Sequence, residues 1–371
     1  MKHLSVLIKP ASSLCNLRCR YCFYANVSSL REISSYGKMK QEVVDKLIQQ
    51  IFMDLKDNDQ ITFTFQGGEP TLAGLIYYQH FIEFVQQQTK QVKVHYALQT
   101  NGVLINKQWC KFLKEHDFLV GLSIDGHPQF HNQNRLDAKG KGTFERVLQA
   151  KMLFDVYRIE YNVLCVLTNQ LATHAEEVVH FIKRENIHYI QFIPCLDELK
   201  EEKNNDYVLT PKKFFTFYRD FFQLWWTELV KGNYIRVKLF EDVIHLLVNQ
   251  QVTACGILGN CQVQYVIEAD GGVYSCDFYV LDEYRLGYIQ EQTLKEIFES
   301  PPLKKFLCPK KQPLKKCEQC VFQQMCGGGC KRMKEVMYVD KNNFCGYQAF
   351  LSLFIPKISE ILRYIEGADQ C

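Results

Sequence analysis

The first two hundred residues repeat one pattern six times, a β-rich segment followed by a segment of helix length. The predicted strands cover residues 4–9, 61–65, 92–98, 119–124, 159–168 and 189–194. Strands that alternate with helices in this order lie parallel and are joined by right-handed crossovers. Six such units predict an α/β fold built on a partial (βα)6 barrel rather than a closed eightfold one, with ligands at the carboxyl ends of the strands.

Composition excludes several classes of protein. Hydrophobic residues make up 47% and charged residues 23% of the chain, which is typical of globular rather than disordered proteins. The net charge of +3 argues against binding to nucleic acid or membrane through bulk charge. The short apolar stretch after His3 is too brief for a signal peptide, and no apolar run approaches the roughly 20 residues of a membrane span. We therefore expect a cytoplasmic protein.

The character of the chain changes after about residue 200. An aromatic helix is predicted from Pro211, and the chain beyond Cys255 is loop-rich, with a β-hairpin turning at 270–272 and a closing helix over 350–365. We expect a barrel with connecting helices over 1–235 and a second domain over 236–371. Ten of the 16 cysteines lie beyond residue 254, and without an export signal that density indicates metal binding rather than disulfides.

Three closely spaced cysteines, Cys15, Cys19 and Cys22, follow the first predicted strand. Iron–sulfur clusters are held by thiolates, and a cubane cluster normally takes four of them. Three thiolates with no fourth nearby would leave one iron open to another ligand. The alternatives are a zinc knuckle or three unrelated buried thiols, and a structural zinc site needs four ligands. The spacing favours an iron–sulfur cluster.

A second set of eight cysteines occupies the C-terminal part of the chain. It comprises Cys255, Cys261, Cys276, Cys317, Cys320, Cys326, Cys330 and Cys345. Eight thiols are enough for two complete four-cysteine sites, either two further clusters or a pair of zinc ribbons. Five cysteines remain, most of which we expect to be ordinary buried thiols: Cys110, Cys165, Cys195, Cys308 and Cys371.

The N-terminal motif, with Tyr21 before the last cysteine, resembles the signature of radical S-adenosylmethionine (SAM) enzymes. The segment Gln66-Gly67-Gly68-Glu69-Pro70 resembles the GGE motif of that family. The resemblance implies a partial (βα)6 barrel and a [4Fe–4S] cluster whose open iron is chelated by SAM. It also implies that the loop backbone and Glu69 hold the methionine ammonium. Ser123 and Arg135 would reach the SAM carboxylate or ribose, Leu196 would contact the adenine, and Tyr21 would line the same pocket.

The C-terminal cysteine pattern resembles the SPASM domain, which carries two auxiliary [4Fe–4S] clusters in radical SAM enzymes that modify peptides and proteins. The resemblance implies three clusters in all. It assigns Cys255, Cys261, Cys276 and Cys330 to auxiliary cluster I. It assigns Cys317, Cys320, Cys326 and Cys345 to auxiliary cluster II.

Longer stretches are similar to anaerobic sulfatase-maturating enzymes, including residues 9–13, 65–74, 98–102, 120–123 and 276–282. Those enzymes oxidise a Cys or Ser of a sulfatase to Cα-formylglycine. The resemblance implies that a deoxyadenosyl radical abstracts hydrogen from the substrate Cβ and that an electron passes to an auxiliary cluster. Asp277 would deprotonate the substrate thiol or hydroxyl. From the residues alone, Asp277 could equally be a turn residue that binds nearby backbone N–H groups.

The same resemblance also implies two partners for the protein. They would be an unfolded or nascent sulfatase polypeptide and an external low-potential electron donor of flavodoxin or ferredoxin type. We expect a monomer that binds neither nucleic acid nor membrane. Two rival functions are another SPASM maturase that forms a thioether or carbon–carbon crosslink, and a non-enzymatic iron–sulfur or zinc protein. The short segment before Cys15 offers little room for the leader-binding domain common in such maturases.

Overall fold

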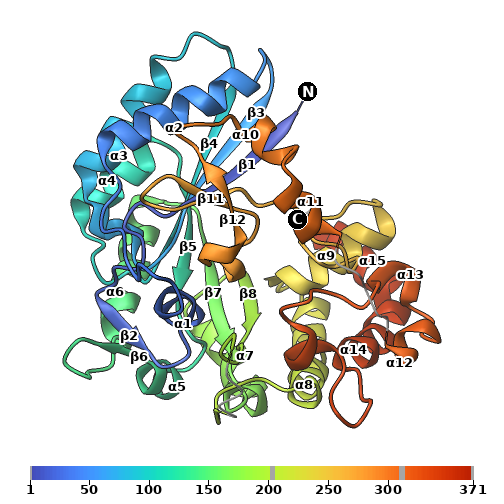
Figure 1. Ribbon diagram of the computed structural model, residues 1–371. Helices are drawn as coiled ribbons and strands as arrows, with labels where there is room; N and C mark the ends of the chain where they lie inside the picture. The colour runs from blue at the N-terminus through green and yellow to red at the C-terminus, as the bar shows by residue number, and fades with distance from the viewer. Residues whose placement is uncertain (1, 201–204, 309–313, 369–371) are drawn as a thin grey trace. The chain divides into compact units, whose positions relative to one another are not determined.

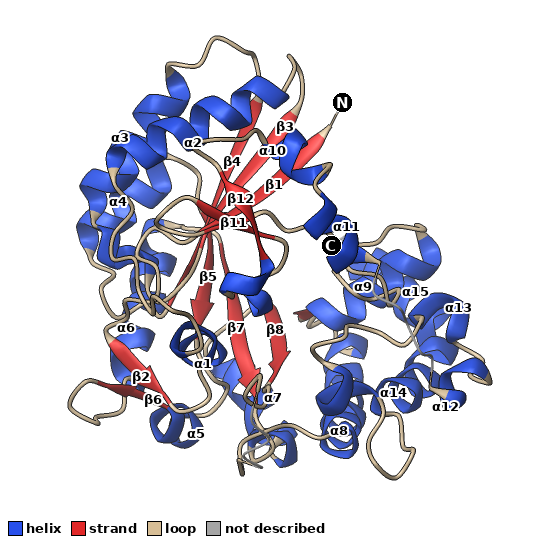
Figure 2. Cartoon of the chain, in the orientation of Figure 1, coloured by secondary structure: helices blue, strands red, loops and turns tan. Residues whose placement is uncertain are grey.

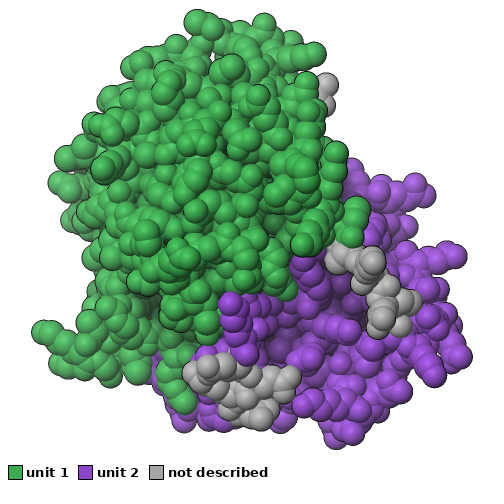
Figure 3. Space-filling view, viewed as in Figure 1, with its two compact units in different colours: residues 1–123, 135–161, 262–310 green, residues 124–134, 162–261, 311–371 purple. Residues whose placement is uncertain are grey.

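A computed structural model describes residues 2–200, 205–308 and 314–368. The chain forms two compact units, shown in different colours in Figure 3. Unit 1 comprises 1–123, 135–161 and 262–310, and unit 2 comprises 124–134, 162–261 and 311–371. Both units therefore combine segments from before and after residue 235. Within the described ranges, no helix is long and apolar enough to cross a membrane.

The main sheet of unit 1 has the strand order β12-β11-β10-β1-β3-β4-β5. Its strands are β1 (His3–Ile8), β3 (Gln60–Phe65), β4 (Lys93–Thr100), β5 (Leu119–Ser123), β10 (Val266–Ile267), β11 (Gly272–Tyr274) and β12 (Arg285–Tyr288). The strands β1, β3, β4 and β5 are parallel to their neighbours, as predicted. The predicted hairpin is formed by β10 and β11. In addition, β10 pairs in parallel with β1, so the hairpin extends the barrel sheet.

Helices cover the parallel strands of unit 1 (Figures 1 and 2). They are α2 (Gln41–Asp54), α3 (Leu75–Gln86), α4 (Lys107–Glu115) and α6 (Phe144–Tyr157). From the C-terminal segment, α10 (Leu294–Phe298) packs against α2, and α11 (Pro301–Leu307) packs against β12. Helix α2 buries Val44, Leu47, Ile48 and Ile51, whose spacing of three and four residues places them on one face. The core against α3 is aromatic: the rings of Phe63 and Phe81 meet edge to face, with centroids 5.0 Å apart.

Three short elements of unit 1 lie outside the main sheet. The strand β2 (Leu17–Cys19) pairs antiparallel with β6 (Arg135–Asp137) to form a separate two-stranded sheet. Helix α1 (Phe23–Ser29) begins directly after Cys22. The cysteine motif is therefore divided between a strand and a helix N-terminus.

Unit 2 contains the remaining two predicted strands, β7 (Tyr161–Leu167) and β8 (Tyr189–Pro194), which pair in parallel. Strand β9 (Arg236–Val237) pairs with β8. The helices are α5 (Pro128–Asn134), α7 (Ala175–Arg184), α8 (Pro211–Val230), α9 (Lys238–Val248), α12 (Lys315–Glu318), α13 (Gln323–Cys326), α14 (Gly346–Phe354) and α15 (Ile358–Ala368). The predicted aromatic helix is α8; its buried Phe221 and Trp225 pack on Phe240 of α9.

The predicted closing helix over 350–365 consists of two helices. Helices α14 and α15 are separated by a 3₁₀ turn, Ile355–Lys357. The cause is Pro356, which has no backbone N–H to donate to the preceding turn and whose ring clashes with that turn. Phe350 and Phe354 of α14 are buried against Phe240, so this part of the C-terminal segment belongs to the core of unit 2.

Candidate active site

The cysteine loop follows β1, and all three of its cysteines are partly exposed. The sulfur of Cys15 accepts the backbone N–H of Leu17 at 3.4 Å, and that of Cys22 accepts the N–H of Ala25 at 3.4 Å as the cap of α1. Burial raises the pKa of the Cys15 thiol to about 11. Backbone N–H bonds to sulfur accompany thiolate ligation of iron–sulfur clusters and tune their potential. The loop fits the predicted three-thiolate site.

The glycine-rich loop after β3 rests directly on the cysteine loop. The N–H of Gly68 donates to the Ser12 carbonyl at 2.9 Å, and the N–H of Glu69 donates to the Leu14 carbonyl at 2.8 Å. A Cβ on Gly68 would lie 2.1 Å from the Leu14 carbonyl oxygen. The absence of a side chain at Gly68 therefore permits the close approach of the two loops.

The Glu69 side chain is buried beneath these loops. Its Oε1 accepts hydrogen bonds from Thr71 Oγ1 at 2.6 Å and Thr100 Oγ1 at 2.7 Å, and its Oε2 accepts the Asn101 N–H at 2.8 Å. Burial raises the pKa of Glu69, and the hydrogen bonds from Thr71, Asn101 and Thr100 oppose that rise. Asn101 also donates from Nδ2 to Asn16 in the cysteine loop. The loops after β1, β3 and β4 therefore meet at the Glu69 carboxylate.

Asp277 begins a 3₁₀ turn (Asp277–Tyr279) directly after Cys276 and is buried. Its Oδ1 lies 2.5 Å from Lys9 Nζ, and its Oδ2 accepts a hydrogen bond from Gln66 Nε2 at 2.8 Å. Lys9 is 0% exposed, and its Nζ lies 3.7 Å from the centroid of the Tyr24 ring. The carboxylate is thus held by residues that follow β1 and β3, at the end of the sheet where the glycine-rich loop lies.

A second buried carboxylate, Glu268, joins the hairpin of β10 and β11 to the cysteine loop and α1. It accepts hydrogen bonds from Ser12 Oγ at 2.9 Å, from the Tyr24 hydroxyl at 3.0 Å and from Arg31 Nη1 at 2.5 Å. Burial and the neighbouring Glu268 carboxylate raise the pKa of Tyr24 well above its usual range, so the phenol stays protonated and donates. Lys9, Tyr24, Arg31 and Glu268 were not singled out as site residues from the sequence.

The residues predicted to contact SAM fall in both units. In unit 1, the Arg135 guanidinium lies over the Tyr21 ring, 5.5 Å from its centroid, and both residues are buried. Ser123 is the last residue of β5 and is 8% exposed. In unit 2, Leu196 follows β8 and is buried. Tyr21 and Arg135 are therefore brought together, and Ser123 lies at the end of β5 and Leu196 after β8, as expected.

Four C-terminal cysteines of unit 2 line one cavity. They are Cys317, Cys320, Cys326 and Cys345, and Tyr338 and Tyr347 complete much of the wall. Burial raises the pKa of the Cys326 thiol to about 12, to which the nearby Cys345 contributes. The sulfur of Cys345 also caps α14 by accepting the N–H of Gln348 at 3.4 Å. This set matches the ligands predicted for auxiliary cluster II and fits a cluster.

The ligands predicted for auxiliary cluster I are divided between the units. Cys255, Cys261 and Cys330 belong to unit 2, and Cys276 belongs to unit 1. Within unit 2, a Cβ on Gly256 would lie 2.8 Å from the Cys330 Cβ, so the segment after Cys255 packs against Cys330. This proximity supports the non-sequential pairing of those two cysteines.

The other cysteines lie outside these clusters. Cys110, Cys165 and Cys195 are buried as expected, Cys308 is exposed, and Cys371 lies outside the described residues. Among the described residues, no three Cys, His, Asp or Glu side chains lie close enough together to hold a single metal ion. In a cubane cluster each thiolate binds a different iron, so its ligands surround a larger volume.

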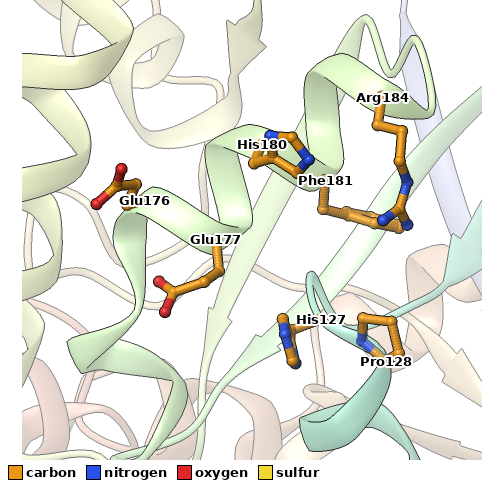
Figure 4. Close-up of a pocket in the computed structure, with 7 residues that line it drawn as sticks. All are labelled: His127, Pro128, Glu176, Glu177, His180, Phe181 and Arg184. Atoms are coloured by element: carbon orange, nitrogen blue, oxygen red, sulfur yellow. The ribbon is translucent and has the colours of Figure 1, made fainter.

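Unit 2 also has a surface pocket without cysteines (Figure 4). His127 of the loop after β5, Pro128 at the start of α5 and five residues of α7 line it: Glu176, Glu177, His180, Phe181 and Arg184. None of them was predicted as a site residue. The pocket is lined by acidic and basic side chains, and nothing observed at it indicates a particular ligand.

Two family models match the chain. The radical SAM superfamily matches residues 10–190, and an iron–sulfur cluster-binding domain named SPASM matches residues 255–321. Fold and site together define a radical SAM protein with a C-terminal SPASM domain, which confirms the predicted fold class. A curated cysteine-type anaerobic sulfatase-maturating enzyme of Clostridium novyi is 41% identical over 97% of both chains. The chain belongs to the anaerobic sulfatase-maturating enzymes.

Further relatives and solved structures agree. A serine-type enzyme of Bacteroides thetaiotaomicron is 30% identical over 89% of this chain and 83% of its own. The solved structure of native anSMEcpe with bound AdoMet is 40% identical, covers 99% of this chain and all of its own, and superposes with a TM-score of 0.89. A second structure of that protein contains AdoMet and a Kp18Cys peptide and superposes with a TM-score of 0.88.

Proposed function

We propose that this enzyme acts on a cysteine of a sulfatase polypeptide and converts it to Cα-formylglycine without oxygen. Three cysteine-type relatives are 39–41% identical, whereas the serine-type relatives are 28–30% identical. The observation that carries the catalytic part is the buried Asp277 carboxylate held between Lys9 and Gln66. A fixed carboxylate of this kind can accept a proton from a substrate thiol.

The residues that would hold the cofactors follow from the described sites. Cys15, Cys19 and Cys22 would bind the first [4Fe–4S] cluster. The cavity cysteines would bind auxiliary cluster II, and Cys255, Cys261, Cys276 and Cys330 would bind auxiliary cluster I. When bound, SAM and the reduced first cluster supply a hydrogen-abstracting radical, and the auxiliary clusters supply an acceptor for the second electron of the substrate.

The chain's own residues then bind and deprotonate the substrate. Loss of a Cβ hydrogen atom, the thiol proton and one electron turns the cysteine CH₂–SH into a thioaldehyde, and water replaces sulfur by oxygen with release of hydrogen sulfide. Asp277 takes the thiol proton. Lys9 supplies the countercharge for its carboxylate, and Gln66 fixes the orientation of Oδ2.

For SAM itself, we propose the contacts that the family resemblance implies. Glu69 and the backbone of Gly67 and Gly68 would hold the methionine ammonium. Glu69 Oε1 already accepts hydrogen bonds from Thr71 and Thr100, and Oε2 accepts one from Asn101, so Oε2 is the better-placed oxygen for a further donor. The remaining proposed contacts are Tyr21, Ser123, Arg135 and Leu196.

We also propose the cellular setting. The enzyme would act in the cytoplasm as a monomer on an unfolded or nascent sulfatase, with electrons from a flavodoxin- or ferredoxin-type donor. We propose two functional domains, a radical SAM barrel over 1–235 and an auxiliary-cluster domain over 236–371.

Mass spectrometry of two matched peptides tests the function. Anaerobically reconstituted, reduced enzyme is incubated with SAM and a synthetic Cys-x-Pro-x-Arg peptide, or with its Ser counterpart. We expect the Cys peptide to lose two hydrogens and exchange sulfur for oxygen, faster than the Ser peptide loses two hydrogens. Deoxyadenosine release with unchanged peptides would instead favour a crosslink-forming SPASM maturase. Faster turnover of the Ser peptide would overturn the cysteine-type assignment.

A further inference from the structure

The small β2–β6 sheet connects a surface hairpin to the cysteine motif. Leu17, Arg18 and Cys19 pair with Asp137, Leu136 and Arg135, respectively. Strand β2 lies between Cys15 and Cys22 in the sequence, so β6 is paired with the segment that carries the first cluster's ligands, and the turn of residues 138–142 directly follows β6. Part of each of the three motif cysteines is itself exposed.

This surface is basic. Arg18 and Arg20 of the motif, Lys139 and Lys141 of the turn, and Arg146 of α6 are all exposed. We call these five residues the basic hairpin surface. Its five basic residues face only two acidic neighbours in the sequence, Asp137 and Glu145, so its net formal charge is +3, equal to the net charge of the whole chain. Leu14, which precedes Cys15, is 39% exposed and provides an apolar side chain beside the motif.

The turn is held in a defined shape by Asp137. Its Oδ1 accepts the backbone N–H groups of Lys139 and Lys141, both at 2.9 Å, and its Oδ2 accepts from Arg146 Nη2 at 2.8 Å. Both oxygens of the Asp137 carboxylate are therefore occupied by hydrogen bonds that stabilise the turn. The two lysines are presented on an ordered turn rather than on a free loop, which reduces the entropy lost on binding a partner.

We infer that the basic hairpin surface is the docking site of the electron donor, an acidic, low-potential, one-electron carrier protein. The inference rests on the proposed function, which requires that the first cluster be reduced from outside. A donor must approach that cluster closely, and complementary charge around an apolar contact steers such transient encounters. A surface joined to the ligand loop brings the donor to that cluster.

Charge reversal at the turn tests the inference without altering the cysteine motif. The variant is Lys139→Glu/Lys141→Glu. The matched control is Lys56→Glu/Lys93→Glu in the same unit, because both control lysines are exposed and Lys93 begins β4 at the strand end opposite the cysteine loop. The dissociation constant for an acidic flavodoxin is measured by calorimetry with the reconstituted holoenzyme, at low and at high salt.

We expect the turn variant to bind flavodoxin about tenfold more weakly at low salt, with a smaller salt dependence, and the control to bind like the wild type. Deoxyadenosine formation driven by dithionite, which needs no docking protein, should be equal in all three. Equal weakening in both variants, or unchanged affinity in the turn variant, would overturn the inference. Failure of the proposed function would appear separately, as unmodified peptide in the dithionite-driven reaction of the wild type.

Discussion

Lys9 and Asp277, which lie far apart in the sequence, form an ion pair with Nζ and Oδ1 2.5 Å apart. Lys9 is 0% exposed and Asp277 is 7% exposed. A buried charge of this kind persists only when it is paired, and removing one partner is costly. The pair joins the first residue after β1 to the residue that follows a predicted cluster ligand.

Lys9→Met should lower the rate of peptide oxidation by about a hundredfold while iron content and deoxyadenosine release are retained. The substitution keeps the apolar stem and removes the countercharge of Asp277. Peptide oxidation is followed by mass spectrometry beside the exposed control Lys93→Met, which should behave like the wild type. If Lys9 acts through Asp277, adding Lys9→Met to Asp277→Asn should cause little further loss. Independent, multiplying losses in that double variant would refute this role.

Gly68→Ala should abolish SAM binding. The new Cβ would lie 2.1 Å from the Leu14 carbonyl oxygen and push the glycine-rich loop off the cysteine loop. The control is Gly74→Ala, where no atom lies within 4 Å of the new Cβ but φ is +90°. That strain should cost about 1–3 kcal/mol of stability with SAM binding intact. Equilibrium dialysis with labelled SAM measures the affinity of both variants, and thermal unfolding measures their stability. Normal SAM affinity in Gly68→Ala would contradict the packing argument.

Gly329→Ala should disturb the auxiliary-cluster region, and Gly232→Ala, which lies just after α8 and outside the four-cysteine cavity, should not. Both glycines have positive φ, so both substitutions carry a similar backbone cost of about 1–2 kcal/mol. Only the Cβ at residue 329 meets the Tyr338 ring, 2.0 Å from Cζ. Tyr338 borders the four-cysteine cavity. We expect lower iron content in Gly329→Ala alone, measured per chain after anaerobic reconstitution. Equal iron in both variants would show that the ring can move aside.

The three clusters should load independently. Cys317→Ala/Cys320→Ala should leave roughly eight of twelve irons per chain, as should the removal of Cys15, Cys19 and Cys22 together. Only the second of these variants should lose SAM cleavage. The buried Cys110, which lies outside the proposed sites, provides a control: Cys110→Ala should keep all twelve. Loss of all iron from a folded variant of either set would show that the clusters are interdependent.

Local sequence patterns were sufficient to predict much of the fold. All six barrel strands and the hairpin were predicted, because alternating β and helical periodicity and the Asp270-Gly271-Gly272 turn are local signals. The parallel pairing of β10 with β1 was not predicted. Such a pairing joins segments far apart in the chain, and neither segment contains a local signal for its partner.

The cysteine sites were predictable from spacing and resemblance, but their supporting residues were not. Lys9, Arg31 and Glu268 are charged, and charged residues are mostly exposed, so the sequence gives no reason to bury them. Each is buried because its partner is supplied by a distant segment. A charged residue at the end of an apolar strand, as Lys9 and Glu268 both are, is the one signal that could have indicated them.

The pairing of β1 with β10 has a consequence for how the protein is made. Strand β1 leaves the ribosome long before β10, its neighbour in the sheet, is synthesised. Until then the nascent protein carries an open strand edge, and Lys9 and Arg31 lack the carboxylates that neutralise them in the finished structure. Open strand edges invite aggregation, so this interval is when the nascent chain most needs protection by a chaperone.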